Sequence, residues 1–297
     1  MKKKIVVRLQ GGLGNQLFIY ASTKSLALRS DAEHLLDYIS GFERDFAYKR
    51  SYQLHRFNIS SDLCSDSDRF EPFGRQRRFY MRNAYRNSDF KYSKYIFQTS
   101  SSFSQEFLQL ETRFPKVYVE GYWQSQKYFE DINTIIRNEF QLKDDLMPDV
   151  LVAKNQIVRQ NSVCVHFRSF SAESQTSKHH VAEVSKRYYK AAFNFILSTI
   201  PAAHFYIFSD KRSDAFKVLP LENISHTFVS DLLEQTDPFS DLYLMTQCRH
   251  HIISNSTFAW WGAWLNNDPS QIVISPRMEE TNQWGFSGLI PDKWLVL

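Results

Sequence analysis

Long apolar runs and cysteines are scarce in this 297-residue sequence. No stretch approaches the roughly 18 apolar residues that a membrane-spanning helix requires, and the apolar residues behind the first lysines are too few for a secretory signal. The cysteines are widely spaced and odd in number, which argues against a disulfide framework or a zinc site; they are Cys64, Cys164 and Cys248. These features predict a cytoplasmic protein with reduced thiols.

Nucleic-acid-binding motifs, internal repeats and low-complexity tracts are also missing, so we expect no RNA or DNA partner. What is present is a globular composition, 43% hydrophobic and 15% aromatic, in a chain long enough for one large or two ordinary domains. Most of the aromatic rings are expected in the core, and others would stack on sugars or bases. The net charge of +4 favours anionic ligands or anionic lipid surfaces.

The second half of the chain alternates strand-like and helix-like segments. We expect strands at 163–167, 205–208, 227–229, 252–254 and 272–274, and helices at 187–199, 213–218, 257–265 and behind the cap residue Asp237. This alternation predicts right-handed crossover units and a doubly wound parallel sheet, in which ligands bind beyond the carboxyl ends of the strands. The residues expected at those ends are Arg168, Asp210, Asn255, Ser256 and Thr257.

The start of the chain predicts a strand, a glycine-rich turn and a helix. A strand at 5–9 is followed by helical periodicity from 17 to 28, and the turn between them contains Gly11, Gly12, Gly14, Asn15 and Gln16. Its spacing matches neither the dinucleotide-binding fingerprint nor the Walker loop. Two interpretations stay open: a loop whose backbone approaches a ligand at a helix N-terminus, or a turn that only needs positive φ.

The remainder of the first half is less regular. A strand at 34–36 ends at Asp37, a strand and turn follow at 117–123, and a polar helix or linker is expected at 143–160. Residues 75–86 hold five arginines interleaved with aromatic residues. They form either a patch for a membrane surface or an acidic substrate, or a solvated helix face whose arginine stems cover apolar surface. We predict two α/β domains, 1–155 and 156–297, which face each other across a cleft.

His166 and Arg168 are the first residues with evident chemical potential. Side chains alternate along a strand, so both point to the same side, where they suit a pyrophosphate; an ion pair that holds Arg168 is the structural alternative. The polar residues before the 257–265 helix would cap that helix and bind phosphate. Three tryptophans follow at helical spacing and are expected in the core, with sugar stacking as the alternative: Trp260, Trp261 and Trp264.

Five motifs follow one another along nearly the whole chain: Gly-Gly-Leu-Gly-Asn-Gln-Leu-Phe at 11–18, Glu-Gly-Tyr-Trp-Gln-Ser at 120–125, His-x-Arg at 166–168, Phe-Tyr-Ile-Phe-Ser-Asp at 205–210 and Asn-Ser-Thr-Phe-Ala-Trp-Trp-Gly-Ala-Trp at 255–264. In these motifs, and in Ser-Gly-Phe-Glu at 40–43, the sequence resembles the family 11 glycosyltransferases, the galactoside α-1,2-fucosyltransferases. The resemblance implies a GT-B-like pair of Rossmann-like domains, with the acceptor on the first and a GDP-sugar on the second.

The implied reaction is metal-independent, inverting transfer of L-fucose from GDP-β-L-fucose to the 2-hydroxyl of a galactoside in a cell-surface glycan. The resemblance implies no metal and no cofactor. The acceptor would be a galactose-containing oligosaccharide or a lipid-linked glycan, which the enzyme would meet in the cytoplasm at the inner membrane face.

The resemblance also implies roles for individual residues. Donor binding would fall to His166, Arg168, Asp210, Asn255, Ser256 and Thr257, and the glycine-rich loop with Asn15 and Gln16 would complete the site. Arg168 and Asn15 would be catalytic, and Arg168 would be the fixed cation that stabilises the charge that grows on the departing GDP. A general base must activate the acceptor hydroxyl, and four residues stay open for that role: Asp37, Glu43, Glu120 and His166.

One departure from the family pattern follows Arg168 directly. The family usually has Arg-Arg-Gly-Asp here, whereas this chain has Arg168-Ser169-Phe170-Ser171 and so lacks the second arginine and the aspartate. Either Arg168 suffices with help from Lys178 or Arg187, or donor binding is weakened. The rival interpretations are a transferase that uses another GDP-sugar or acceptor hydroxyl, and a non-catalytic module that binds a carbohydrate or a nucleotide.

A metal-dependent alternative would use Asp66-Ser67-Asp68, which matches an Asp-x-Asp string but lies in a polar segment and not at the end of an apolar strand. Two pairs of adjacent histidines would point to opposite faces of a strand and so make poor metal-ligand sets; they are His179-His180 and His250-His251.

Overall fold

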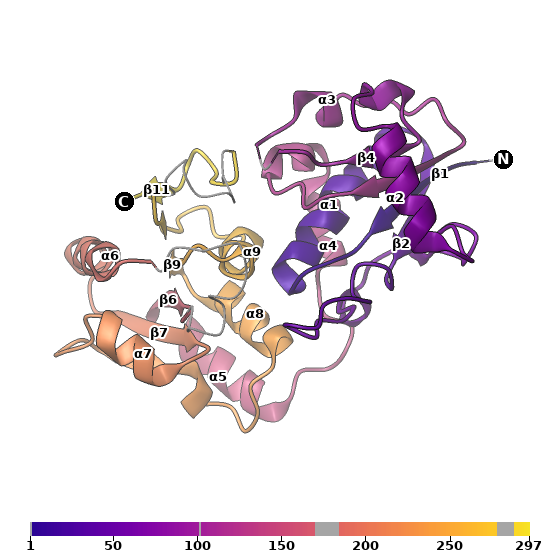
Figure 1. Cartoon of the computed structure of the whole chain (residues 1–297). Helices are drawn as coiled ribbons and strands as arrows, with labels where there is room; N and C mark the ends of the chain where they lie inside the picture. Colours follow the sequence, from indigo (N-terminus) through magenta and orange to yellow (C-terminus); the bar gives the residue numbers. More distant parts are fainter. Residues whose placement is uncertain (1, 101, 170–183, 278–287) are drawn as a thin grey trace. The chain divides into compact units, whose positions relative to one another are not determined.

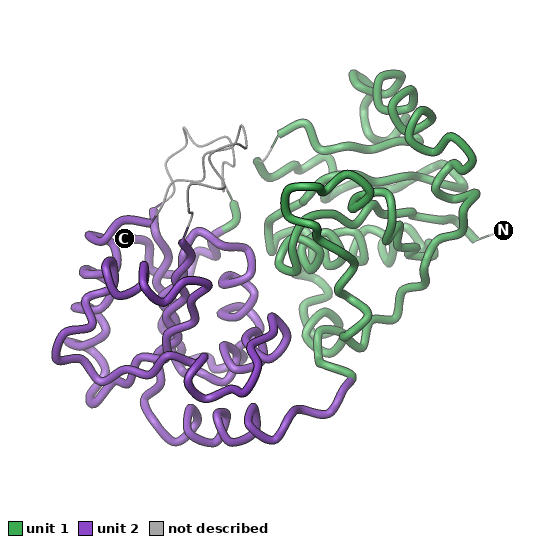
Figure 2. The backbone as a smooth tube through the Cα atoms, turned by 60° about the horizontal axis from the view of Figure 1, so that its bottom comes forward, with its two compact units in different colours: residues 1–143, 286–289 green, residues 144–285, 290–297 purple. Residues whose placement is uncertain are grey.

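The computed structural model describes residues 2–100, 102–169, 184–277 and 288–297. The chain forms two compact units, which Figure 2 shows in green and purple. Unit 1 comprises Met1–Lys143 and the segment Phe286–Leu289, of which Gly288 and Leu289 are described; unit 2 comprises Asp144–Gly285 and Ile290–Leu297.

The division falls earlier than the predicted boundary between 155 and 156. The helix α5 (Pro148–Val158) packs against β6 and α8 of unit 2, and its buried residues include Val150, Ala153 and Ile157. An apolar helix face belongs to the domain that covers it, so the helix expected at 143–160 is part of unit 2 and not a linker.

Unit 1 is built on a five-stranded sheet within the described residues, with the order β3-β2-β1-β5-β4 and all of these pairs parallel. Its strands are β1 (Lys3–Arg8), β2 (Ala32–Asp37), β3 (Asp62–Leu63), β4 (Tyr95–Phe97) and β5 (Lys116–Glu120). The register pairs Arg8 with Asp37 and Val7 with Val119, so Arg8, Asp37 and Glu120 end three neighbouring strands at one edge.

The longest helix of unit 1 in the described part is α1 (Leu13–Arg29), which contacts β1 and β2 through a largely buried surface. The helix α2 (Gly74–Ala84) contacts β4, and its residue Met81 packs with Phe70, Tyr85 and Phe97 on a cluster around Tyr95 and Tyr118. Figure 1 shows α1 and α2 beside the sheet of unit 1. The remaining helical segments are α3 (Gln105–Leu108), α4 (Asn133–Glu139), η1 (Leu54–Arg56), η2 (Phe90–Tyr92), η3 (Gln126–Tyr128) and η4 (Glu130–Ile132).

Unit 2 contains a parallel sheet of six described strands in the order β11-β10-β9-β6-β7-β8. They are β6 (Asn161–Phe167), β7 (Ala203–Ser209), β8 (His226–Phe228), β9 (His250–Ile252), β10 (Val273–Ser275) and β11 (Leu295–Val296). The central strand β6 is buried along almost its whole length, which is typical of a parallel strand whose two faces are both covered. The alternation of strands and helices predicted for this half is confirmed, and the strand expected at 252–254 lies slightly earlier.

The helices of unit 2 in the described part are α5, α6 (Lys186–Thr199), α7 (Arg212–Val218), α8 (Pro238–Gln247) and α9 (Thr257–Leu265), with the short η6 (Val229–Asp231). Phe193 of α6 stacks on Phe205 of β7 with ring centroids 4.3 Å apart, so this helix covers one face of the sheet. The predicted cap of α8 is confirmed, because the Asp237 carboxylate accepts hydrogen bonds from the Phe239 and Ser240 N–H groups.

Three short strands were missed by the sequence patterns: β3, β4 and β11. Each has only two or three residues, too few for a period to be visible, and each is held in its sheet by a neighbouring strand. Among the described residues, no helix is long and apolar enough to cross a membrane.

Candidate active site

Three neighbouring strands of unit 2 end beside one another and carry the predicted donor-binding residues. The order β9-β6-β7 is parallel, so Arg168 after β6, Asp210 after β7 and the segment 255–257 after β9 lie at the same edge of the sheet. A side-chain hydrogen bond joins the ends of β6 and β9, since the His166 Nδ1 and Ser254 Oγ atoms are 2.8 Å apart. The predicted candidates of this half therefore share one edge.

Arg168 is only loosely paired. Its Nε lies 4.0 Å from the Asp210 Oδ2, and both side chains are 44% exposed. The other Asp210 oxygen accepts a hydrogen bond of 2.8 Å from the Ser169 N–H group. An exposed ion pair of this length contributes little to folding. The ion pair that was the structural alternative to pyrophosphate binding is therefore present. It leaves much of the guanidinium exposed to solvent, where an anion can bind it.

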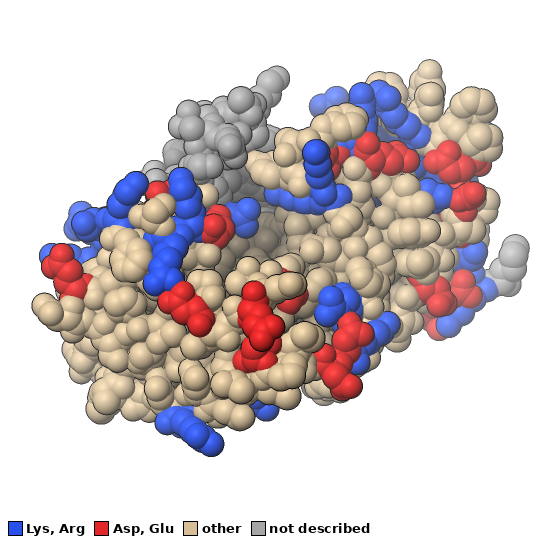
Figure 3. Space-filling model, turned by 90° about the horizontal axis from the view of Figure 1, so that it is seen from below, with Lys and Arg blue, Asp and Glu red and all other residues tan. Residues whose placement is uncertain are grey.

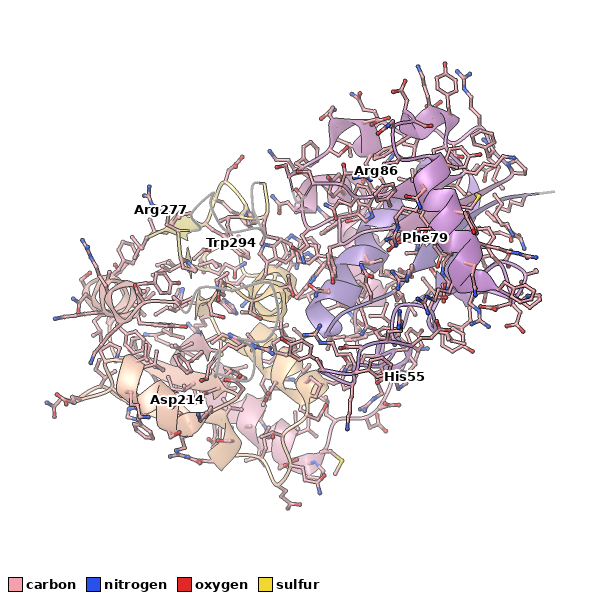
Figure 4. All side chains as sticks on the ribbon, in the orientation of Figure 1. His55, Phe79, Arg86, Asp214, Arg277 and Trp294 are labelled. Atoms are coloured by element: carbon pink, nitrogen blue, oxygen red, sulfur yellow. The ribbon has the colours of Figure 1, made fainter. Side chains whose placement is uncertain are left out.

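Ser169 stands where the family usually has its second arginine, and its side chain contacts α7. Its hydroxyl donates a hydrogen bond of 2.7 Å to Asp214 Oδ2 in α7. Hydrogen bonds from Ser169 and Lys211 hold the pKa of Asp214 at about 2. Figure 4 labels Asp214 on α7. This departure therefore exchanges a cation for a neutral tether at the edge of the site.

Of the two cations proposed to assist Arg168, Arg187 is among the described residues. Lys178 lies outside the described residues, as do Phe170, Ser171 and the pair His179-His180. Arg187 lies in the first turn of α6 and is exposed.

His166 is buried inside the edge that it was predicted to serve. Besides the contact with Ser254, its ring lies 6.0 Å from that of Phe258, and its carbonyl accepts a hydrogen bond from Tyr189. Burial, with a smaller contribution from the charge of Arg168, lowers the pKa of His166 to about 3. A neutral imidazole with so low a pKa is a weak general base, so this environment suits an orienting role better.

We expect the His166 ring to stay neutral between pH 8 and pH 5 in the folded protein. Burial penalises the imidazolium, so protonation begins only as the pH approaches the lowered pKa of about 3. Its imidazole NMR signals should not move over that range, whereas in the urea-unfolded chain they should titrate near pH 6.5. A folded-state titration between pH 5 and pH 8 would contradict the expected burial of the charge.

The polar residues before α9 divide their roles. Ser256 is the cap, because its Oγ accepts a hydrogen bond from the Phe258 N–H group. The first turn of α9 is fully described and contains no acidic residue, so the positive end of the helix dipole is not offset there. Asn255 and Thr257 flank the cap. The tryptophans are in the core as expected, with Trp260, Trp261 and Trp264 packed on one another.

In the glycine-rich turn of unit 1, one glycine and the buried Gln16 serve the turn itself. Gly11 has φ +76°, and a Cβ there would lie 2.6 Å from Asn15 Nδ2, so this glycine is needed by the turn itself. Gln16 is buried and ties the turn to a neighbouring loop: its amide donates to the carbonyls of Gly11 and Ser51 and accepts from the Gln53 N–H group. Asn15 Oδ1 accepts a hydrogen bond of 2.9 Å from Gln124.

A substitution at Gly12 distinguishes a loop whose backbone approaches a ligand from a turn that serves the fold alone. A Cβ at this position would meet only Arg50 Nε, at 3.9 Å, and its φ of −73° suits any residue. We expect Gly12→Ala to change the free energy of unfolding by less than about 0.5 kcal/mol. If a ligand approaches this backbone, the same variant should raise the KM for the donor or the acceptor at least several-fold. An unchanged KM would mean that the turn serves the fold alone.

The edge of the unit 1 sheet holds two of the other candidate bases, Asp37 and Glu120, in a buried network, whereas the Glu43 side chain is 42% exposed. Asp37 is fully buried and accepts hydrogen bonds from the Tyr118 hydroxyl, at 2.6 Å, and from the Ser40 N–H group. Glu120 accepts hydrogen bonds from Arg8, at 2.7 Å, from Tyr95, at 2.5 Å, and from Arg82.

Burial raises the pKa of Glu120, but the charge of Arg8 and hydrogen bonds from Tyr95 and Arg82 outweigh it and hold the pKa below its ordinary value. The sequence patterns did not single out Arg8, Arg82, Tyr95 or Tyr118 as partners of these acids. The only available signal was the position of Arg8 at the end of the first strand.

The string considered for a metal is engaged in ion pairs. Asp66 pairs with Arg69, and Asp68 lies 3.6 Å from Lys4 and 3.4 Å from Lys116. His250 and His251 turn to different partners, the Ile272 N–H group and the Met245 carbonyl. Across the part of the chain that the structure describes, no group of three or more His, Cys, Asp or Glu is arranged to hold a metal ion.

The profile described as glycosyl transferase family 11 matches residues 73–284, most of the chain. The chain belongs to glycosyl transferase family 11. Two curated Escherichia coli relatives match over nearly full length. This chain is 27% identical to "Alpha-1,2-colitosyltransferase", over 98% of each chain. It is 29% identical to "O-antigen biosynthesis glycosyltransferase WbnK", over 97% of this chain and 99% of the relative. Glycosyltransferase activity follows from this membership.

Solved structures agree with the fold of this family 11 chain. A variant of Arabidopsis thaliana FUT1 in complex with GDP matches with a TM-score of 0.53 and 11% identity, over 95% of this chain and 72% of that one. NodZ alpha-1,6-fucosyltransferase soaked with GDP-fucose matches with a TM-score of 0.51 and 13% identity, over 89% and 93%. POFUT1 in complex with GDP-fucose gives a TM-score of 0.51 at 12% identity, over 92% and 98%. These likenesses confirm two parallel-sheet α/β domains of the GT-B-like type.

Proposed function

We propose that this transferase moves L-fucose from GDP-β-L-fucose to the 2-hydroxyl of a galactoside in a cell-surface glycan, with inversion and without a metal. The observation that carries the proposal is the edge of unit 2, where the exposed Arg168 and the capped N-terminus of α9 follow neighbouring strands. Both features suit the diphosphate of a nucleotide sugar. The relative named for O-antigen biosynthesis supports a lipid-linked or oligosaccharide glycan as acceptor and a cytoplasmic place of work.

In this reaction the acceptor oxygen attacks the anomeric carbon of the fucose, the bond from that carbon to the diphosphate breaks, and GDP departs with the bond electrons. Positive character develops on the sugar and negative charge on the diphosphate. Arg168 would stabilise that negative charge, assisted by the N–H groups at the start of α9. His166, neutral and bonded to Ser254, would keep these two strand ends in place.

A base must take the proton of the acceptor hydroxyl, and we assign this role to Glu43 among the four candidates. His166 and Glu120 have lowered pKa values, and Asp37 is fully buried with both oxygens engaged. The Glu43 side chain is 42% exposed and lies 3.8 Å from Arg78. Its carboxylate is therefore the one that an acceptor sugar can reach most freely.

A second candidate donor is GDP-linked colitose. The relative named as an α-1,2-colitosyltransferase supports this candidate. The neutral Ser169 in place of the usual arginine fits a changed donor preference as well.

The test is to incubate the protein with GDP-fucose or GDP-colitose, β-galactoside acceptors and EDTA, and to measure GDP release and product mass. Transfer of fucose in the presence of EDTA would support the main proposal. The colitosyl product would be lighter by one oxygen atom and would favour the second donor. GDP binding without any transfer would contradict both proposed donors or the proposed acceptor. Loss of transfer in Glu43→Gln, with unchanged GDP binding, would support Glu43 as the base.

A further inference from the structure

We propose that the outward face of α2 docks on an anionic phospholipid surface. This surface, the α2 face below, consists of the exposed helix residues Arg75, Arg77, Phe79 and Tyr80, with Phe73 just before the helix and Arg86 just after it. The inference concerns where the enzyme works and goes beyond the transfer reaction itself.

The fold divides the residues of this segment into two sets. Met81 and Tyr85 pack on the core of unit 1, and the buried Arg78 donates a hydrogen bond of 2.9 Å to the carbonyl of Arg69. Arg82 pairs with Glu120. These inward residues follow helical spacing, so residues 75, 76, 79, 80 and 83 must face away from the core, and all of them are exposed. Two of the five arginines are thus held inward and three are exposed, of which Arg77 also donates a hydrogen bond of 3.2 Å to the carbonyl of Phe70.

The α2 face presents three aromatic rings to solvent. Phe73, Phe79 and Tyr80 are 66%, 62% and 70% exposed. Phe79 and Tyr80 lie against each other edge to face, with ring centroids 5.8 Å apart, and Figure 4 shows Phe79 labelled on α2. Exposed rings on a helix are unfavourable in water but suit the interface between lipid headgroups and acyl chains, where an apolar ring and a polar hydroxyl both find partners.

The positive charge around these rings favours an anionic surface. The sequence from 73 to 88 contains no aspartate or glutamate, and Arg75, Arg77 and Arg86 are exposed around the aromatic residues. On the face of the molecule that Figure 3 draws, groups of basic and acidic side chains lie beside one another. Basic residues beside exposed aromatics are the composition of helices that lie in the plane of an anionic membrane.

The experiment is co-sedimentation of the full chain with vesicles of phosphatidylcholine alone or mixed with phosphatidylglycerol, at low and moderate salt. We expect binding to the anionic vesicles only, and weaker binding as salt rises. Arg75→Glu combined with Arg86→Glu should lower the bound fraction at least tenfold, and Phe79→Ser combined with Tyr80→Ser at least threefold. The matched control on α6, Lys190→Glu with Leu197→Ser, replaces one exposed cation and one exposed apolar residue and should bind like the unchanged protein.

Three results would overturn the proposal: no binding of the unchanged protein to anionic vesicles, equal loss in the α6 control, or loss in the arginine variant without loss in the aromatic variant. The last result would mean that the protein adsorbs to charged headgroups through arginines alone, without the insertion of aromatic rings that the α2 face requires. All variants should keep their thermal unfolding midpoint and their transfer rate to a water-soluble acceptor. That readout separates failure of docking from failure of the proposed transfer reaction.

Discussion

Arg168→Ala is expected to lower kcat/KM for sugar transfer by about 100- to 1000-fold, because loss of one fixed donor from the charge that develops in a transition state has effects of this size. The free energy of unfolding should change little. The side chain is 44% exposed, and its ion pair with Asp210 is long. Initial rates over a range of donor concentrations, with a thermal unfolding curve for each variant, provide the measurement.

Two controls make the Arg168 result specific. Arg168→Lys keeps the charge but loses the planar fork, and it should recover part of the lost rate. Arg249→Ala removes an exposed arginine just before β9, at the opposite end of that strand from the site, and should leave the rate unchanged. Full activity of Arg168→Ala would contradict the assignment of the donor site to this edge of unit 2.

Glu120→Ala is expected to destabilise the protein by about 3 kcal/mol, because it leaves the charge of Arg8 uncompensated in a largely buried place, whereas Arg82 is 42% exposed. The lost interactions are the ion pairs with Arg8 and Arg82 and the hydrogen bond from Tyr95. Urea unfolding at neutral pH measures the change. Glu111→Ala, at an exposed position, is the control and should stay within about 0.5 kcal/mol of the unchanged protein.

Acidification provides an independent check on the same network. The pKa of Glu120 is lowered in the folded state, so the unfolded chain takes up its proton first as the pH falls. The stabilisation is complete above the unfolded pKa of roughly 4.3 and is lost as the pH falls through the lowered folded value. Glu120→Gln should therefore lose less stability than the unchanged protein between pH 5 and pH 3. Equal losses would mean that this carboxylate is not held by its neighbours.

Much of unit 2 was predictable because its signals are local. A buried parallel strand is apolar along its length, as β6 is, and a helix start shows its cap in the sequence, as Asp237 and Ser256 do. Three of the motifs that indicate the family, at 166–168, 205–210 and 255–264, lie at those strand ends, where a ligand would bind. The position of Arg168 at the end of β6 therefore followed from the sequence.

The predicted boundary at 155/156 was wrong because the side on which α5 packs depends on β6 and α8, which follow it in the chain. The sequence likewise shows five arginines between 75 and 86, but not that Arg78 and Arg82 turn inward while Arg75 and Arg86 are exposed. That division depends on where Arg69 and Glu120 lie.

The same distinction holds for the chemistry of the candidate residues. The sequence by itself determined which residue types stand at the strand ends, since strands and turns are encoded by neighbouring residues. Only the tertiary structure decided that His166 is buried against Ser254 and that Glu120 is held by Arg8 and Arg82. Burial and charge partners set a pKa, and both come from segments far apart in the chain.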